Sequence, residues 1–354
     1  MPLGSELLCK SSGYFWNKQY LCKKIPKKIT MKRVLGLGNA LVDALVQVSN
    51  DNILSELSLP KGSMQLIDTE RYAEVCQRMA TMPVKRATGG SACNTVLALA
   101  HLDAHPGLIG RVADDDNGRF FADNCRRYGI NAILLPDSLS TGVASTFISA
   151  DGQRTFATYL GAAANLTADD LRPELLEGYD YLYIEGYLVQ NHDLIARAVE
   201  LAKRGGLQVC LDLASYNIVE AERDFFGYLL ERTDIVFANE EEARAFTGLE
   251  AREALDKLAA LCPVAVVKTG RDGSMARCGE DFATIGAEPV TQVVDTTAAG
   301  DFFAAGFLYR HALGLPLRDC LEAGGLLAAA VIQVVGTEVP ESGWEALRTR
   351  ILKK

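Results

Sequence analysis

The chain has 354 residues, of which 49% are hydrophobic and 23% charged, and these proportions are ordinary for a soluble globular protein with a sizeable core. Its formal net charge of −9 argues against nucleic acid or an anionic membrane as a main partner. Nine cysteines without any C-x-x-C pair favour reduced thiols in a cytoplasmic protein over a disulfide framework or a structural zinc site.

Residues 1–30 differ in composition from the rest of the chain. Six lysines stand there against one acid, Glu6, and the stretch has neither a continuous apolar region nor a small-residue cleavage site. The sequence "MKRVLGLGNALVD", from Met31, is typical of the beginning of a domain. We therefore expect one domain over 31–354, preceded by a disordered basic tail or by sequence translated from a mis-assigned start. A targeting or binding arm is the alternative.

From Met31 onward, short apolar runs alternate with amphipathic patterns. In chain order, the runs typical of strands are 34–38, 107–111, 181–184, 207–211, 234–237 and 264–268. The helical patterns cover 91–102, 118–128, 193–203, 240–247, 300–313, 317–334 and 344–352. Strands separated by helices predict βαβ units, and therefore an α/β fold whose mostly parallel sheet lies between two layers of helices. The apolar run near 323–335 is shorter than the roughly 20 residues needed to span a membrane.

Two regions rich in β-type sequence interrupt this alternation. Runs at 45–48 and 63–67 precede the first long helix, and runs at 132–135, 142–150 and 154–160 follow the second. The sequence "ADGQRT" joins the last pair and is typical of a hairpin turn. We expect these pieces, from about 44–70 and 131–162, to form one small sheet that covers the main domain as a lid.

The segment "DTTAAGDFFAAGF" places a carboxylate at the start of an apolar helix. Three small residues, Ala298, Ala299 and Gly300, precede Asp301. If the helix begins here, the unpaired N–H groups of residues 298–301 form an anion pocket that the helix dipole strengthens. Asp301 is then placed to accept a proton from a hydroxyl that attacks a phosphoryl group. The alternative is an N-cap or first-turn acid of a buried helix.

Two further motifs carry polar residues suited to vicinal hydroxyl groups. "GNALVD" offers Asn39 and Asp43 just past the first strand, where α/β sheets bind ligands. "GGSACN" offers Gly89, Gly90 and Asn94 at the start of a helix. The alternatives are turn formation by the first motif and simple helix capping by the second.

Two more motifs follow strands near the middle of the chain. "FANEEEA" places Asn239 and Glu242 on one face of a helix start, where they would hold water around Mg²⁺ near phosphates, although a solvated acidic turn is the alternative. "VVKTGRDGS" has Gly270 and Gly273, which permit a tight loop against a nucleotide or form an ordinary β-turn.

Other phosphate-binding and kinase signatures are missing from the sequence. There is no G-x-x-x-x-G-K-[ST] motif and no H-R-D or D-F-G set, which argues against a P-loop protein and a protein kinase. "GLGNAL" begins like a dinucleotide fingerprint but has Leu41 where the last glycine belongs, which weakens a dehydrogenase interpretation.

In this order, "GNALVD", "GGSACNT", "FANEEEA", "KTGRDGS" and "DTTAAGD" resemble the ribokinase-like (PfkB-type) sugar and nucleoside kinases over roughly residues 33–340. The resemblance implies a three-layer α/β/α fold with a small β-sheet lid, and ATP and Mg²⁺ as cofactors, with K⁺ as a candidate monovalent cation. It implies Asp301 as catalytic base and residues 298–301 as anion hole. It also assigns a nucleotide-binding loop, with Asn239 beside it; the loop residues are Lys268, Thr269, Gly270 and Gly273. Asn239 and Glu242 together match a family motif that supports magnesium through water.

One position departs from the family's commonest signature. Glycine usually stands where this chain has Ala298. Because alanine occupies the position here, we expect residue 298 to have a backbone conformation that alanine can adopt. A non-catalytic sugar or nucleoside sensor on the same fold would be expected to lose the base or the anion hole, and both are retained. The family's exposed lid strands often pair between subunits, so the resemblance makes a homodimer formed through the lid a candidate assembly.

The longer matching spans are most similar to the adenosine kinases of this family. On that alignment Asn39, Asp43, Gly90 and Asn94 would hold a ribose ring. Tyr187 falls where adenosine kinases stack an aromatic ring on the base, while Glu185 falls where ribokinases bind the sugar. Either residue alternatively supports the core at a strand end.

The acceptor therefore stays open at this point: adenosine, another nucleoside, ribose, fructose or 2-keto-3-deoxygluconate. A phosphorylated acceptor is disfavoured because the lid strands carry no basic cluster, with Arg154 as the one candidate.

Overall fold

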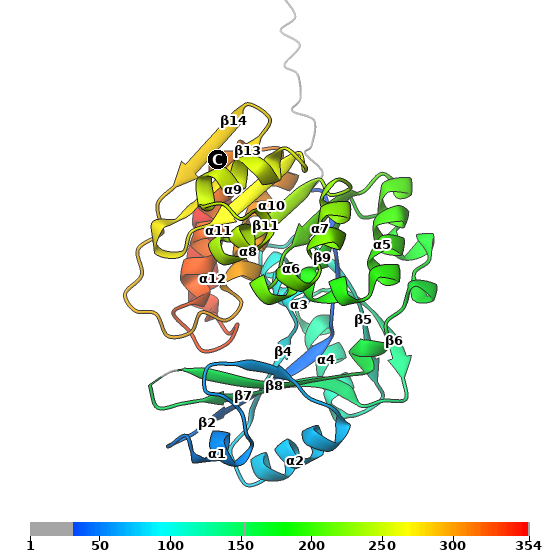
Figure 1. Cartoon of the computed structure of the whole chain (residues 1–354), viewed down its shortest axis with the longest axis vertical. Coiled ribbons are helices and arrows are strands. Elements are labelled where there is room, and N and C mark those ends of the chain that lie inside the picture. Colours follow the sequence, from blue (N-terminus) through cyan, green and yellow to red (C-terminus); the bar gives the residue numbers. More distant parts are fainter. Residues whose placement is uncertain (1–30, 152, 353–354) are drawn as a thin grey trace, which may run out of the picture. The chain divides into compact units, whose positions relative to one another are not determined.

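The computed structural model describes residues 31–151 and 153–352, and Figure 1 shows their arrangement. The prediction for residues 1–30 lies outside the described residues. Residues 31–354 form one compact unit, and the fold described below belongs to that unit.

A nine-stranded sheet with the order β14-β13-β12-β11-β10-β9-β1-β5-β6 forms the middle layer. Its strands are β1 (Val34–Leu37), β5 (Gly107–Ala113), β6 (Asn131–Asp137), β9 (Tyr181–Glu185), β10 (Gln208–Asp212), β11 (Ile235–Asn239), β12 (Val264–Lys268), β13 (Ser274–Cys278) and β14 (Asp281–Ile285). Strands β1, β5, β6 and β9 to β12 are parallel, and β13 and β14 add an antiparallel hairpin at one edge. The parallel strands all end at the same edge, where ligands of such sheets bind.

Both faces of this sheet are buried under helices, because successive side chains of a strand point to opposite sides. In β9, Tyr181 and Tyr183 belong to one hydrophobic cluster, and Leu182 and Ile184 belong to another. The first cluster includes helices α3 (Ser91–His101), α4 (Asp116–Arg127), α10 (Ala299–Ala312), α11 (Leu317–Val331) and α12 (Glu341–Leu352). The second includes α5 (His192–Gly205), α6 (Tyr216–Ala221), α7 (Arg223–Leu230), α8 (Glu240–Thr247) and α9 (Ala251–Ala259). The predicted three-layer α/β/α fold is confirmed.

The connecting segments include five short 3₁₀ turns among the described residues. They are η1 (Ala162–Asn165), η2 (Ala168–Asp170), η3 (Pro173–Leu176), η4 (Gly186–Gln190) and η5 (Gly270–Asp272). Two of them, η4 and η5, directly follow strand ends of the large sheet and contribute to the site described below.

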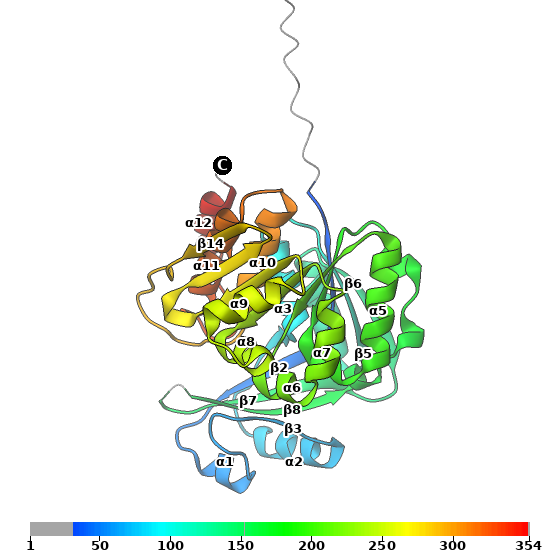
Figure 2. The same cartoon turned by 45° about the horizontal axis from the view of Figure 1, so that its top comes forward.

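A second sheet, with the order β3-β8-β7-β2-β4, lies beside the carboxyl ends of the large sheet (Figure 2). Its strands are β2 (Leu41–Gln47), β3 (Met64–Leu66), β4 (Lys85–Gly89), β7 (Thr141–Ile148) and β8 (Arg154–Gly161). Helices α1 (Asn52–Glu56) and α2 (Thr69–Met79) pack on one face, around the buried ring of Phe147. The opposite face carries Leu41 and Asp43 of β2 and Phe156 and Thr158 of β8, which line a cavity.

The composition of the small sheet differs from the prediction in two respects. We expected residues 132–135 to join it, but β6 pairs in parallel with β5 along Gly107–Ala113 in the large sheet. The reason is topological: β5, α4 and β6 form a βαβ unit, which returns its second strand beside the first. Strand β4, which we did not expect, pairs with β2 instead.

Two further findings concern the described residues taken together. Within the part of the chain that the structure describes, no helix has both the length and the apolar character that crossing a membrane requires. All seven cysteines in that part are free thiols.

Candidate active site

A cavity of about 1100 Å³ lies at the carboxyl ends of the parallel strands, between the two sheets. Five neighbouring strands each deliver a polar residue to it at or just after their last position: Asn39 (β1), Glu185 (β9), Asp212 (β10), Asn239 (β11) and Lys268 (β12). We call the part lined by β2, β3, β7 and β8 the lid end, and the part lined by η5, β13 and the residues after β14 the loop end. The crevice outside the strand ends is the usual ligand site of open α/β sheets.

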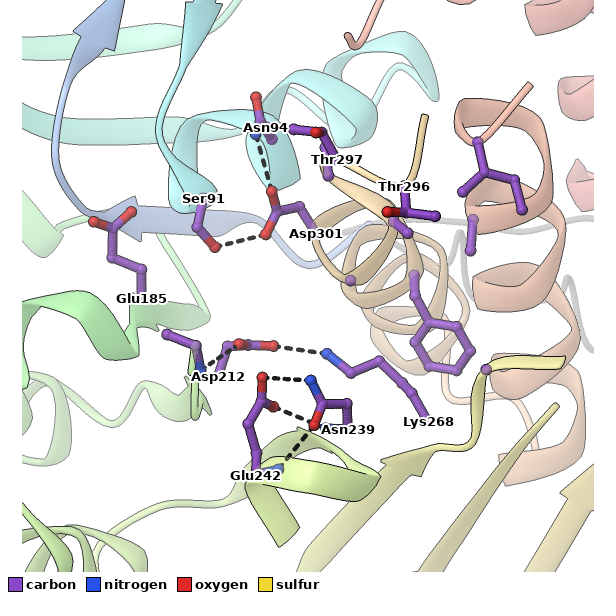
Figure 3. A pocket seen from close by; sticks show the side chains of 18 of the residues that line it. Ser91, Asn94, Glu185, Asp212, Asn239, Glu242, Lys268, Thr296, Thr297 and Asp301 are labelled. Atoms are coloured by element: carbon purple, nitrogen blue, oxygen red, sulfur yellow. Dashed lines mark hydrogen bonds and ion pairs between the residues drawn. The ribbon is translucent and has the colours of Figure 1, made fainter. Parts of the chain in front are cut away.

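Asp301, in the first turn of α10, is held by side chains of α3 (Figure 3). Ser91 Oγ donates to Asp301 Oδ1 across 2.6 Å, and Asn94 Nδ2 donates to Oδ2 across 2.9 Å. Burial raises the pKa of Asp301 to about 6, and the hydrogen bonds from Ser91 and Asn94 oppose that rise. The carboxylate caps no backbone N–H of its own helix. It is therefore a fixed carboxylate, ionised near neutral pH, with the chemistry of a general base.

The start of α10 differs from the prediction at two residues. Ala299 N donates to Thr296 O across 3.2 Å, so only Ala298, Gly300 and Asp301 have N–H groups without an acceptor among the described residues. Ala298 has a φ of 60°, in the left-handed region, and not the conformation open to alanine that we expected. Three N–H groups and the helix dipole still form an anion pocket.

At the lid end, a half-buried carboxylate and a buried amide oxygen have no hydrogen-bond donor within the described residues. Asp43 packs against Gly89, where a Cβ atom would collide with its carboxylate, and no hydrogen bond to this carboxylate is present. Burial raises the pKa of Asp43 to about 7. The Oδ1 atom of Asn94 is also buried without a partner. A buried acceptor is normally satisfied, and a carboxylate that lines a cavity can accept from a ligand there, so both groups fit the hydroxyl donors of a ligand.

Asn39 and Glu185 are bonded to each other. Glu185 Oε1 accepts from Asn39 N and Nδ2 across 2.8 and 2.6 Å, and Oε2 accepts from Ala92 N across 2.9 Å. Gly90 lets this turn close, because a Cβ atom there would collide with the Asn39 carbonyl. Burial raises the pKa of Glu185 to about 7. Glu185 lines the cavity, but its strongest contacts join β1 to the start of α3.

Tyr187 lies in η4, directly after β9, and lines the same cavity. Its side chain is 37% exposed, which makes it one of the large apolar residues with free surface. A ring in this position can stack on a planar ligand group.

At the loop end, Asn239 and Glu242 form a reciprocal capping box at the start of α8. Asn239 Oδ1 accepts from Glu242 N across 2.8 Å, and Glu242 accepts from Asn239 N and Nδ2 across 2.8 and 2.7 Å. Glu242 is only 3% exposed, which rules out the solvated acidic turn. Burial raises its pKa to about 7.

The fit of these groups to magnesium follows from their number and type. No cluster of three or more acidic, histidine or cysteine side chains that could hold a metal exists in the described residues. A direct protein cage for Mg²⁺ is therefore absent from them. Glu242, Asp212 and the Asn239 amide fit an ion that keeps its waters and binds mainly to substrate phosphates.

The loop after β12 has the tight form predicted from its glycines. Gly270 and Gly273 have φ of 53° and 104°, and Thr269 N donates to Gly273 O across 2.9 Å. Both glycines line the cavity, as does Lys268. Thr269 and Gly89 do not line it, although we grouped them with the site.

Several site residues escaped the sequence reasoning. Ser91 lies inside the "GGSACN" motif. Asp212 ends its strand just as Glu185 and Asn239 end theirs, so for Asp212 the position at the end of a strand was the available signal. Arg154, the one candidate for binding a phosphorylated acceptor, is paired with Asp295 at 2.5 Å and does not line the cavity.

Comparisons with known proteins show which family and which folds this chain is similar to. Residues 62–342 match the model of the pfkB family of carbohydrate kinases. Two solved structures are similar at 34% identity: a probable sugar kinase from Rhizobium etli, with a TM-score of 0.83 over 92% of this chain and 100% of that one, and the adenosine kinase from Sinorhizobium meliloti, with a TM-score of 0.82 over 91% and 100%. A 5-dehydro-2-deoxygluconokinase from Geobacillus thermodenitrificans is 28% identical over 272 residues, 71% of this chain and 80% of that protein.

Proposed function

Because the chain belongs to the pfkB family of carbohydrate kinases, we propose that it transfers the γ-phosphoryl group of ATP to a primary hydroxyl of a sugar or nucleoside. The observation that carries this proposal is the position of Asp301. Its carboxylate lines the cavity together with the free N–H groups that begin α10 and with the unsatisfied acceptors of the lid end. Base, anion pocket and hydroxyl-binding groups thus share one cavity, as phosphotransfer to an alcohol requires.

The reaction follows from this arrangement. ATP lies at the loop end with its phosphates toward the start of α10, and the acceptor lies under the small sheet. The acceptor oxygen attacks the γ-phosphorus while its proton passes to Asp301, and the bond from that phosphorus to the β-γ bridging oxygen breaks to release ADP. Glu242 and Asp212 would hold magnesium through water, and the ion would supply positive charge against the phosphates. The N–H groups of Ala298, Gly300 and Asp301 receive the oxygens of the transferred group.

The acceptor end favours a neutral molecule with an apolar face. Its wall is formed by the side chains of Leu41, Met64, Leu66, Ala144, Phe156, Leu160 and Tyr187. The cationic side chains that line the described cavity, Lys268 and Arg271, both belong to the loop end. A sugar acid would need a cation at the lid end, whereas a nucleoside offers hydroxyls to Asp43 and Asn94 and a planar base to Tyr187.

A single assay tests the proposal. ADP release is measured with ATP and Mg²⁺ across adenosine, inosine, ribose, fructose and 2-keto-3-deoxygluconate. We expect the highest kcat/KM with a nucleoside. A best rate with the sugar acid would overturn the acceptor assignment but keep the reaction. Acceptor binding without ADP release from any compound would instead identify a non-catalytic sensor.

A further inference from the structure

We propose that the ammonium group of Lys268 is a catalytic group of this site, which contacts the phosphoryl group during its transfer and stabilises its negative charge. The inference rests on the proposed function and adds a residue to its chemistry, since the sequence assigned to Lys268 only a place in the nucleotide loop. Lys268 is the last residue of β12, and its Nζ atom donates to Asp212 Oδ2 across 3.1 Å (Figure 3).

The position of this ammonium relative to α10 is the first argument. A Cβ atom built on Gly300 would lie 3.0 Å from Lys268 Nζ, so glycine lets the ammonium approach the beginning of the helix closely. The free N–H groups of Gly300 and Asp301 also belong to this first turn of α10. An ammonium and the positive end of a helix dipole that approach each other this closely together form a site that attracts an anion. The geometry therefore points to a bound polyanion.

The charge state of Lys268 is the second argument. Its side chain is 15% exposed and that of Asp212 is 8% exposed. The Nζ atom lies 3.1 Å from Asp212 Oδ2, so the two side chains form an ion pair with little access to solvent. In this ion pair the ammonium acts as a fixed charge, not as an acid.

Asp212 acts as a positioning residue for this lysine. Its Oδ1 atom accepts from Ala214 N across 2.8 Å, while Oδ2 accepts from the ammonium. The carboxylate is therefore held by the turn after β10 and aims Lys268 along the strand ends. Register pairs Asp212 with Glu185 on one neighbouring strand, so the two carboxylates stand at the same level of the strand ends.

In the transfer step, Lys268 forms and breaks no covalent bond. The acceptor oxygen forms the new bond to phosphorus, Asp301 takes the hydroxyl proton, and the bridging oxygen leaves with ADP. Lys268 donates hydrogen bonds to the phosphoryl oxygens before and after the step. A hydrogen-bond donor that is already directed at the charge developing in the transition state raises kcat by about 10²–10³-fold in comparable sites.

The test compares K268M with the double variant K268M/D212N. The double variant removes both charges, so it avoids leaving Asp212 buried without a partner and keeps the test valid if K268M folds poorly. K257M is the control, because Lys257 donates to the Thr247 carbonyl and does not line the cavity. We measure kcat and KM, and calorimetric affinities for ADP and for a non-hydrolysable ATP analogue.

We expect both Lys268 variants to lose about 10²-fold or more in kcat. They should bind ADP nearly as the wild type does, yet lose the wild-type preference for the analogue over ADP. In a further variant, K268A, added ethylammonium should restore part of the rate, and K257M should match the wild type.

A double variant with near wild-type kcat, or an unchanged analogue-to-ADP preference in either variant, would show that Lys268 only neutralises Asp212. Failure of the proposed function has a different signature, because the wild type itself would then phosphorylate no acceptor. In that case the nucleotide-binding measurements alone decide on Lys268.

Discussion

At the scale of single residues, the site depends on side chains held by donors from other elements. Asp301 belongs to α10 but takes both of its side-chain hydrogen bonds from α3. Glu185 ends β9 but is bonded to the turn after β1 and to the start of α3. Each functional carboxylate is therefore oriented by packing between elements, which keeps its direction fixed before any ligand arrives.

We predict that D301N folds normally and loses about 10²–10⁴-fold in kcat, because an amide cannot accept the hydroxyl proton. In the wild type, kcat should fall as pH drops through about 6, since protonation of Asp301 has the same effect. Steady-state kinetics from pH 5 to 8 measures both. D319N is the control, because Asp319 is likewise a first-turn acid, of α11, and does not line the cavity. A D301N enzyme with a third of the wild-type kcat would exclude Asp301 as the base.

We predict that A298G stabilises the protein. The left-handed conformation at φ 60° costs an alanine roughly 1–2 kcal/mol, while glycine adds about 0.4–1 kcal/mol of unfolded-state entropy. The expected net gain is about 0.5–1 kcal/mol in the free energy of unfolding, measured in urea. The matched control is A122G, inside α4, which should lose about 1 kcal/mol. Equal losses in both variants would show that Ala298 is unstrained.

At the scale of elements, the small sheet is tied to the start of α10. Arg154, the first residue of β8, pairs with Asp295 at 2.5 Å and donates to Thr297 Oγ1 across 3.2 Å. Asp295 also accepts from Thr297 N and Gly336 N across 2.9 and 2.7 Å. One buried carboxylate thus joins the small sheet, the segment before α10 and the loop before α12.

We predict that R154M destabilises the protein by about 3–5 kcal/mol, because it leaves the Asp295 carboxylate buried without its cation. R154M/D295N should recover part of this loss. Arg119, which pairs with Asp114 and Asp116 at the surface, provides the control, and R119M should change stability by less than about 1 kcal/mol. Urea unfolding of the wild type and of these three variants measures the changes. If R154M cost no more than R119M, the two sheets would not be coupled through this pair.

The sequence predicted the bounds of helices and strands better than it predicted which strands pair with each other. Strand 264–268 and helix 240–247 match β12 and α8 at both ends, because clear apolar runs and the Asn239 cap mark them. The assignment of 132–135 to the small sheet was wrong, because an apolar run of that length carries no information about the strand it pairs with.

The same limit applies to the site. Asp43, Asn94 and Asp301, which motifs mark in the sequence, line one cavity. The contact of Asp301 with Ser91 spans 210 positions in sequence, and the Arg154–Asp295 pair is similarly remote, so neither follows from local pattern. The positive φ of Ala298 was missed for a related reason, because the resemblance alone could not show how the backbone turns there.

At the scale of the whole molecule, the site concentrates buried carboxyl groups. Burial raises the pKa of Asp43, Glu185 and Glu242 to about 7, and that of Asp301 to about 6. Substrate hydroxyls and phosphate-bound magnesium would satisfy several of them at once. Without ligands, these groups place a free-energy cost on the folded state whenever they are ionised.

We predict that the unliganded protein becomes less stable as pH rises from 6 to 8. A carboxyl whose pKa is raised by folding binds a proton in the folded chain that the unfolded chain has already lost. Its contribution to stability is fully present below its ordinary pKa and is lost as pH rises through the raised value, here about 7 for Asp43, Glu185 and Glu242. Each group can contribute about 1 kcal/mol across this range. Burial lowers the pKa of His101 and His311, which has the opposite effect, but mainly below their ordinary value of 6.5.

Urea unfolding at pH 6, 7 and 8, at constant ionic strength, measures the effect. The free energy of unfolding should fall by about 1–3 kcal/mol across the series. D43N should lower this slope and raise stability at pH 8, because an amide carries no charge to desolvate. D319N, whose acid does not line the cavity, should keep the wild-type slope. A flat or rising profile in the wild type would mean that these carboxyl groups are ionised in the folded protein at no cost. The cavity would then hold enough water to solvate them, and the preorganised arrangement of charges inferred for the site would be wrong.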